Sequence, residues 1–196
     1  MSELRLFLLQ RLSAAVLAVL VVGHLTGIIL FTHWGLSAAE ILRRVHSSLV
    51  WPALYGLFAL AAVTHGAIGL RAIGRELWRG AGRPLRPHRH HLAWWAFAAH
   101  RLSGLALVLF LPLHFAALGQ LVDQSRFDAF LDWTRSPVLK ASEALLVAAL
   151  ALHLAGGLRL LALEFLPWSE RQKSLIALSG GFAAAVSLLY LLWGAV

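Results

Sequence analysis

Five stretches of the chain are each long and apolar enough to cross a lipid bilayer, and this feature constrains the fold more than any other. A transmembrane helix needs about 20 predominantly apolar residues. The qualifying stretches are Leu12–Phe31, Leu49–Leu70, Ala96–Leu118, Val138–Leu161 and Ser174–Trp193. Backbone groups inside a bilayer must be hydrogen-bonded within their own segment, so each stretch is expected to be helical. The sequence predicts an all-α integral membrane bundle of five transmembrane helices.

Composition and charge support this interpretation. Hydrophobic residues make up 60% of the 196 residues and charged residues only 13%, whereas a soluble domain has about a quarter charged residues. The net charge of +8 is carried between the apolar stretches, so it indicates membrane topology and not nucleic-acid binding. Because the chain has no Cys, it cannot by itself hold disulfides or iron–sulfur clusters. Its ten His are the main metal-ligating residues.

Arginine placement predicts the orientation of the chain in the membrane. The connection Arg71–His91 carries six Arg and one Glu, and the connection Gln120–Pro137 carries three Asp and two Arg. Cytoplasmic connections are rich in Lys and Arg, so we expect the N-terminus inside and the C-terminus outside. Met1–Gln10 is not followed by a cleavage site of small residues, so the first stretch is expected to remain as an anchor. All eight Trp lie at or near the expected ends of the helices, as interfacial indoles do.

The two halves of the chain repeat each other. The first repeated group lies 90 positions apart and comprises Arg11 with Arg101, Ser13 with Ser103, and His24 with His114. The second lies 88 positions apart and comprises His65 with His153, Gly69 with Gly157, and Arg71 with Arg159. We therefore expect one domain over residues 1–196, with repeat one at about 11–78, repeat two at about 100–166 and an extra helix at about 174–193. This is a parallel repeat, whose natural axis lies along the membrane normal.

The four repeated histidines divide into two layers. His24 and His114 follow a cytoplasmic-side Arg by thirteen residues, about 20 Å of helix at about 1.5 Å per residue. His65 and His153 precede such an Arg by six residues, about 9 Å by the same rise. A single zinc needs all its ligands at about 2 Å, which excludes one four-His site. Two haem b groups, each held by two His from facing helices, suit an apolar and thiol-free bundle.

Charged and small residues near these histidines have two interpretations each. The repeated arginines gather at the expected cytoplasmic rim: Arg11, Arg71, Arg101 and Arg159. Their guanidinium groups suit haem propionates, or they snorkel to the interface as topology signals. Ser13 and Ser103 bond either propionates or their own helix backbone. Gly69 and Gly157 either admit a flat macrocycle or serve ordinary packing of small residues between helices.

A polar and aromatic cluster flanks the first outer connection. Its members are His33, Trp34, Glu40, Arg43 and His46. At the membrane edge beside the deep histidine layer, donors, acceptors and an aromatic ring suit a quinone headgroup and its protons. Surface decoration is the alternative interpretation of the same residues.

Two motifs resemble a known family. The segment His100-Arg101-Leu102-Ser103-Gly104 and the stretch from His153 to Arg159 are similar to the cytochrome b anchor subunit of succinate dehydrogenases and fumarate reductases. The first half of the chain resembles the second anchor subunit of the two-anchor forms. Five spans with four His in one chain resemble the single-anchor, two-haem type, and the resemblance covers almost the whole chain.

The resemblance implies ligands, partners and location. His24 would pair with His114 on a distal haem, and His65 with His153 on a proximal haem. The partners would be a flavoprotein carrying the dicarboxylate site, which this chain lacks, and an iron–sulfur protein docked on the cytoplasmic face at the basic connection. Electrons would pass between succinate or fumarate and menaquinone or ubiquinone. The complex would lie in the bacterial cytoplasmic (inner) membrane, and a higher oligomer of the complex is a further expectation.

Departures from the family pattern bear on the quinone. Single-haem members that reduce ubiquinone have a Ser and a Tyr where this chain has Phe97 and Leu77. This favours a quinone site on the outer side, and menaquinone. Two other functions stay open at this point. A dihaem cytochrome b of a hydrogenase or formate dehydrogenase shares the His chemistry, and a small transporter shares the parallel repeat.

Overall fold

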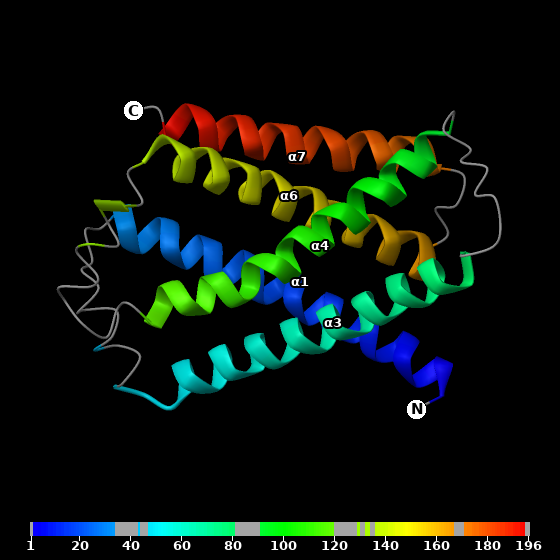
Figure 1. Ribbon diagram of the computed structural model, residues 1–196, viewed down its shortest axis with the longest axis horizontal. Coiled ribbons are helices and arrows are strands. Elements are labelled where there is room, and N and C mark those ends of the chain that lie inside the picture. Colours follow the sequence, from blue (N-terminus) through cyan, green and yellow to red (C-terminus); the bar gives the residue numbers. More distant parts are fainter. Residues whose placement is uncertain are drawn as a thin grey trace. The chain divides into compact units, whose positions relative to one another are not determined.

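The computed structural model describes residues 2–33, 43, 47–80, 91–119, 129, 132–133, 136–166 and 171–194. Its long helices are α1 (Glu3–His33), α3 (Val50–Gly80), α4 (Leu92–Gly119), α6 (Pro137–Phe165) and α7 (Gln172–Gly194) (Figure 1). Each of the five contains an apolar window long enough to cross a membrane. The described residues contain no strand. The prediction of an all-α membrane bundle with five spanning helices is confirmed for this part of the chain.

The helices are longer than the apolar stretches that predicted them. α1 begins at Glu3, before the expected start at Leu12, and α3 continues past Leu70 to Gly80. A change from apolar to charged side chains ends a hydrophobic stretch but leaves the backbone free to continue its helical hydrogen bonds. The two extensions meet in an ion pair, in which Arg75 Nη1 lies 2.6 Å from Glu3 Oε1.

The chain divides into two compact units, and the first, Met1–Gly82, contains α1 and α3. The two helices are antiparallel neighbours. Ser13 near the start of α1 lies beside His65 near the end of α3, and His24 further along α1 contacts Tyr55 near the start of α3. This antiparallel register brings together residues about fifty positions apart in the sequence.

The second unit, Arg83–Val196, contains α4, α6 and α7. α4 and α6 are antiparallel neighbours, because Gly104 faces His153. α7 runs antiparallel to α6, and its Ser179 Oγ donates a 3.2 Å hydrogen bond to the carbonyl of Ala155. α7 has no counterpart in the first unit. In the second unit the histidine-bearing helix α6 therefore packs against two helices, α4 and α7.

Small residues form the helix contacts, and large apolar residues face outward. Among the described residues, the buried hydrophobic ones are all alanines: Ala61, Ala149, Ala151, Ala155 and Ala183. By contrast, Leu109, Leu145 and Leu178 are 74%, 72% and 69% exposed. Lipid tails are as apolar as leucine, so helices in a membrane associate through close packing of small residues. This distribution is therefore the one expected of a chain surrounded by lipid.

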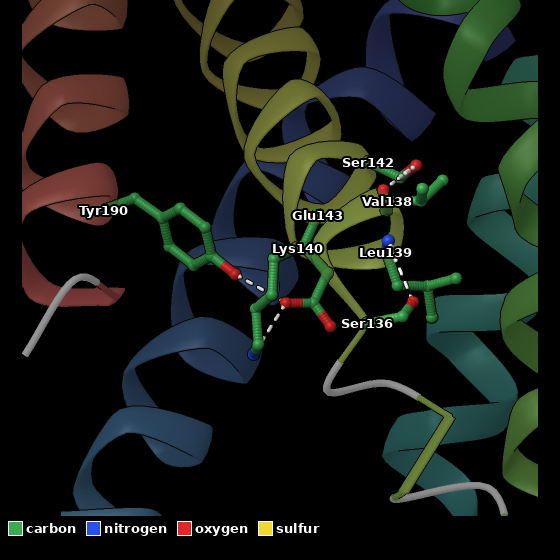
Figure 2. A network of polar contacts seen from close by, with 7 residues as sticks. All are labelled: Ser136, Val138, Leu139, Lys140, Ser142, Glu143 and Tyr190. Carbon is green, nitrogen blue, oxygen red and sulfur yellow. Dashed lines mark hydrogen bonds and ion pairs between the residues drawn. The ribbon is translucent and has the colours of Figure 1, made fainter.

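A polar network joins α6 to α7 near the start of α6 and the end of α7. Figure 2 shows Tyr190 Oη donating a 3.0 Å hydrogen bond to Glu143 Oε2, to which Lys140 Nζ also donates at 3.1 Å. One turn earlier, the Ser136 side chain caps α6 by accepting a 3.4 Å hydrogen bond from the Leu139 N–H. The carboxylate of Glu143 therefore fixes one end of the α6–α7 pair.

We expect Tyr190→Phe to lower the stability of the protein in detergent by about 1 kcal/mol, the typical net value of one intramolecular hydrogen bond. Thermal unfolding followed by circular dichroism measures the change. Ser187→Ala is the matched control on the same helix, since Ser187 Oγ bonds only to the Ala183 carbonyl of its own helix, at 2.7 Å. Equal melting temperatures for the Tyr190 variant and the control would contradict the role given to this network.

Candidate functional site

In the first unit, a buried serine lies between a backbone carbonyl and a histidine. Ser13 is 7% exposed. Its Oγ donates a 3.1 Å hydrogen bond to the Gln10 carbonyl and lies 3.5 Å from Nδ1 of His65 on the neighbouring helix. The serine therefore bonds its own helix, one of the two interpretations open from the sequence, and contacts a predicted haem ligand as well.

The second unit contains the same arrangement. Ser103 is 6% exposed, its Oγ donates to the His100 carbonyl at 3.0 Å, and it lies 3.5 Å from Nδ1 of His153. Here Nδ1 of His153 also lies 3.0 Å from the His100 carbonyl oxygen. A serine, a carbonyl three residues before it and a histidine across the helix interface thus recur at the repeat positions.

These contacts determine which ring nitrogen of each histidine carries hydrogen. A carbonyl oxygen only accepts, so in the bond to the His100 carbonyl the donor is Nδ1–H of His153. The Ser13 hydroxyl donates to the Gln10 carbonyl, and with Nδ1–H present on His65 its oxygen is the matching acceptor, 3.5 Å away. In a neutral imidazole the lone pair is then on Nε2. A metal-ligating histidine is held in this way, by a hydrogen bond from its other nitrogen.

Glycine makes room for the His153 ring. A Cβ placed on Gly104 would lie 2.7 Å from Cε1 of His153, closer than side chains pack. Gly157 and Gly69 are the repeated glycines of the sequence analysis. A Cβ on Gly157 would lie 3.6 Å from Cε1 of His100, and a Cβ on Gly69 would lie 3.8 Å from Nε2 of Gln10. Each repeated glycine therefore packs against the neighbouring helix at ordinary contact distance.

The other two histidines have aromatic surroundings. The His24 ring meets Tyr55 and Phe58 of α3 edge-on, with centroids 6.0 and 5.6 Å apart. The His114 ring lies 5.4 Å from Phe110 and 6.2 Å from Phe115, centroid to centroid. Both histidines are half-buried. In both places the imidazole is the polar group among apolar aromatic rings.

Within the second unit the histidines lie at two levels. His100 and His153 are in contact, and His114 follows His100 by fourteen residues along α4, about 21 Å at about 1.5 Å per residue. His114 and His153 are therefore well separated along this helix pair. His114 lies beside phenylalanines, and His153 lies beside His100.

The repeated arginines on α1 and α4 lie over aromatic rings of their own helices. The Arg11 guanidinium carbon is 5.1 Å from the Phe7 ring centroid, and that of Arg101 is 4.2 Å from the Phe97 centroid. Each side chain thus reaches back towards the N-terminal end of its helix, the direction in which it would snorkel. The contact is a cation–π interaction. A role in propionate binding stays a prediction for both.

The other two repeated arginines differ in burial. Arg71 on α3 is exposed, whereas Arg159 on α6 is only 8% exposed. Arg159 follows Ala155, the residue that accepts the bond from α7, by one helical turn, so the extra helix explains its burial. Its Nε is buried and has no hydrogen-bond partner among the described residues. A buried guanidinium with an unsatisfied N–H favours an anionic ligand such as a propionate.

The predicted quinone cluster lies mainly outside the described residues. This holds for Trp34, Glu40 and His46 and for the side chain of His33. Arg43 is described, and it is exposed. The cluster stays a prediction.

Sequence reasoning missed several contact residues. The motif contains His100, but the sequence does not predict that its ring stacks on His153. It also predicts no contact for Gln10, the repeat counterpart of His100. Phe7 and Phe97 obey the same offset of 90 positions as Arg11 and Arg101, so extending the repeat towards the N-terminus finds them.

The described helices define a membrane-spanning helical protein with a histidine beside a buried serine in each unit. Imidazoles contacted at Nδ1, a buried guanidinium and aromatic neighbours are residues that would fit haem b, which is held by histidines and carries two propionates. This fit is judged from the residue types present within each unit, taken one unit at a time.

Comparison with known proteins identifies the family. The model of the family described as succinate dehydrogenase/fumarate reductase transmembrane subunit matches residues 2–82 and again residues 79–191. The chain therefore belongs to this family of membrane subunits. It is 31% identical over 93 residues, 47% of its length, to 67% of the succinate dehydrogenase 2 membrane subunit SdhC of Mycobacterium tuberculosis (strain ATCC 25618 / H37Rv). No solved structure matches the chain. This result favours the succinate dehydrogenase/fumarate reductase interpretation over a hydrogenase- or formate dehydrogenase-linked cytochrome and over a transporter.

We expect Gly104→Ala to destabilise the protein in detergent by about 1–3 kcal/mol, since the added methyl group overpacks against the His153 ring. Gly180→Ala on α7 is the control, because a Cβ there has no neighbour within 4 Å. This control should be neutral or stabilising by up to about 1 kcal/mol, the helix propensity of Ala over Gly. Thermal unfolding compares the two. A stable Gly104 variant would show that the ring is not held as described.

Proposed function

We propose that this chain is the membrane-anchor and electron-transfer subunit of a succinate:quinone oxidoreductase or quinol:fumarate reductase. The observation that carries the proposal is the serine–carbonyl–histidine arrangement present in both units, built on Ser13 with His65 and on Ser103 with His153. An ionisable residue in a spanning helix is costly and is usually functional. Two histidines that each contact a buried serine through Nδ1 have the form of metal ligands held by their other nitrogen.

The ligand sets of the proposal are those that the family resemblance implies. His65 and His153 hold a proximal haem b, and His24 and His114 hold a distal one. Haem b bound in this way supplies one-electron transfer between the iron–sulfur partner and the quinone. The protein residues orient the imidazoles and surround them with apolar side chains, which exclude water from the ligand positions.

Arginines and serines complete the proposed site. Arg11, Arg71, Arg101 and Arg159 pair with the propionates, and the burial of Arg159 gives that residue the strongest support. Ser13 and Ser103 act through the histidines: they accept from Nδ1–H and remain hydrogen-bonded to their own helices.

The soluble partners dock on the cytoplasmic side. They are a flavoprotein subunit with the dicarboxylate site and an iron–sulfur subunit, and the basic connection Arg71–His91 offers them a positive surface. The quinone, menaquinone in preference to ubiquinone, binds on the outer side at the cluster that includes Glu40 and His46. The complex resides in a bacterial cytoplasmic membrane.

Single replacements of the histidines test the two-haem proposal. His24→Ala and His65→Ala should each reduce the haem content from two per chain to one, because each removes an axial ligand from a different haem. Haem extraction and reduced-minus-oxidised spectra of purified protein measure the count. A well-folded wild-type protein without b-type haem, or one haem shared by all four histidines, would refute the proposal.

Purification of the intact complex from native membranes tests the partners. A flavin-containing subunit and an iron–sulfur subunit should co-purify with this chain, because the chain has no Cys with which to bind such clusters itself. Mass spectrometry and flavin fluorescence identify the subunits. Recovery of a nickel or molybdenum enzyme in their place would contradict the assignment.

A further inference from the structure

His100 is a half-buried histidine that the proposed function does not use. It lies on α4 next to Arg101, and its ring is stacked on that of His153 of α6, with centroids 4.3 Å apart and planes within 2° of parallel. At the corresponding position of the first unit, 90 residues earlier, the chain has Gln10. The second unit thus adds a flat ring where the first has a flexible amide.

The two rings lie between two glycines. A Cβ on Gly104 would lie 2.7 Å from Cε1 of His153, and a Cβ on Gly156 would lie 2.8 Å from Nδ1 of His100. Each glycine lies on the helix opposite to the ring it contacts. The Cε1 end of the His153 imidazole therefore lies against α4 at Gly104, one face of the ring is stacked on His100, and the His100 ring lies against α6 at Gly156.

Stacking restricts tilting of the His153 ring, and hydrogen bonds to Nδ1 restrict rotation of the ring within its own plane. Nδ1 lies 3.0 Å from the His100 carbonyl oxygen and 3.5 Å from Ser103 Oγ. His100 thus contributes twice, through its ring to the plane of the imidazole and through its carbonyl to the direction of Nδ1–H. The position of Nε2 follows from both.

The first unit lacks the residues of this arrangement. The positions that correspond to Gly104 and Gly156 are occupied by Ala14 and Ile68. Both residues carry a side chain where the second unit has glycine, and Gln10 has no ring to stack. His65 retains the serine contact at 3.5 Å.

We propose that His100 is a positioning residue for His153, and that it holds the imidazole plane and its Nδ1–H hydrogen bond so that Nε2 is presented in one orientation. Of the two histidines assigned to the proximal haem, the proposal concerns His153, whose ring is stacked on that of His100. The inference rests on the proposed function, because it concerns an axial ligand of that haem.

The test replaces His100 with the residue of the other unit. His100→Gln removes the ring and keeps the carbonyl, and glutamine already occupies the equivalent position beside Ser13 and His65. We expect both haems to stay bound. The electron paramagnetic resonance signal of one of them should shift or broaden, and its midpoint potential should change, since ligand orientation and hydrogen bonding tune haem iron. The signal of the other haem should be unchanged.

A second variant keeps the test decisive if the first fails to assemble. Gly156→Ala pushes the His100 ring without altering either histidine and should shift the same signal. Gly181→Ala on α7 is its control, because a Cβ there meets nothing within 4 Å, and both signals should keep their wild-type positions.

The outcomes separate the two proposals. If the wild-type protein contains two haems and both the His100 and Gly156 variants show wild-type signals and potentials, the positioning role is wrong and the proposed function stands. If the well-folded wild-type protein contains no haem, both are wrong. A shifted signal in either variant, with haem content retained and the Gly181 control unchanged, supports the inference.

Discussion

The carbonyl oxygen of His100 accepts hydrogen bonds from two side chains, Ser103 on its own helix and His153 on the neighbouring one. The arrangement around His153 depends on this acceptor. In an apolar environment a polar side chain must find its partner within the protein, and helix carbonyls are the acceptors that every turn provides. Ser142, Ser179 and Ser187 use them in the same way. A histidine bonded to a carbonyl can be buried as a neutral ligand with its other nitrogen available.

Close approach of the helices makes such bonds possible. In the part of the chain that the structure describes, the buried hydrophobic residues are alanines, and glycine at 104 lets the His153 ring lie against the α4 backbone. A larger residue at this position would separate the helices and lengthen the distance between the histidine and the carbonyl. The small residues of this chain therefore serve packing and site geometry together, while the large leucines are left to the lipid.

Duplication followed by divergence describes the two units. The arginine–leucine–serine segment has the same burial order in each, with Arg11 and Arg101 half-buried and Ser13 and Ser103 buried, and the family match falls once on each half. The differences lie around this shared frame. The second unit has the additional helix α7 and a buried Arg159, and it replaces Gln10 by the stacked His100. Two histidines at equivalent positions thus have different neighbours at the residue three positions before the serine.

The sequence by itself determined the five membrane helices, the four repeated histidines and the family motif. These follow from the length of apolar stretches and from spacing along one chain, which are local properties that need no knowledge of neighbours. The tertiary structure alone decided that Ser103 bonds a carbonyl as well as contacting His153, that His100 stacks on that ring, that Arg159 is buried, and that Tyr190 reaches Glu143. Except for the Ser103–carbonyl bond, which lies within α4, these features depend on the register of antiparallel helices, which brings together residues far apart in the sequence. A shift of one helical turn, about 5.4 Å, would replace all of them.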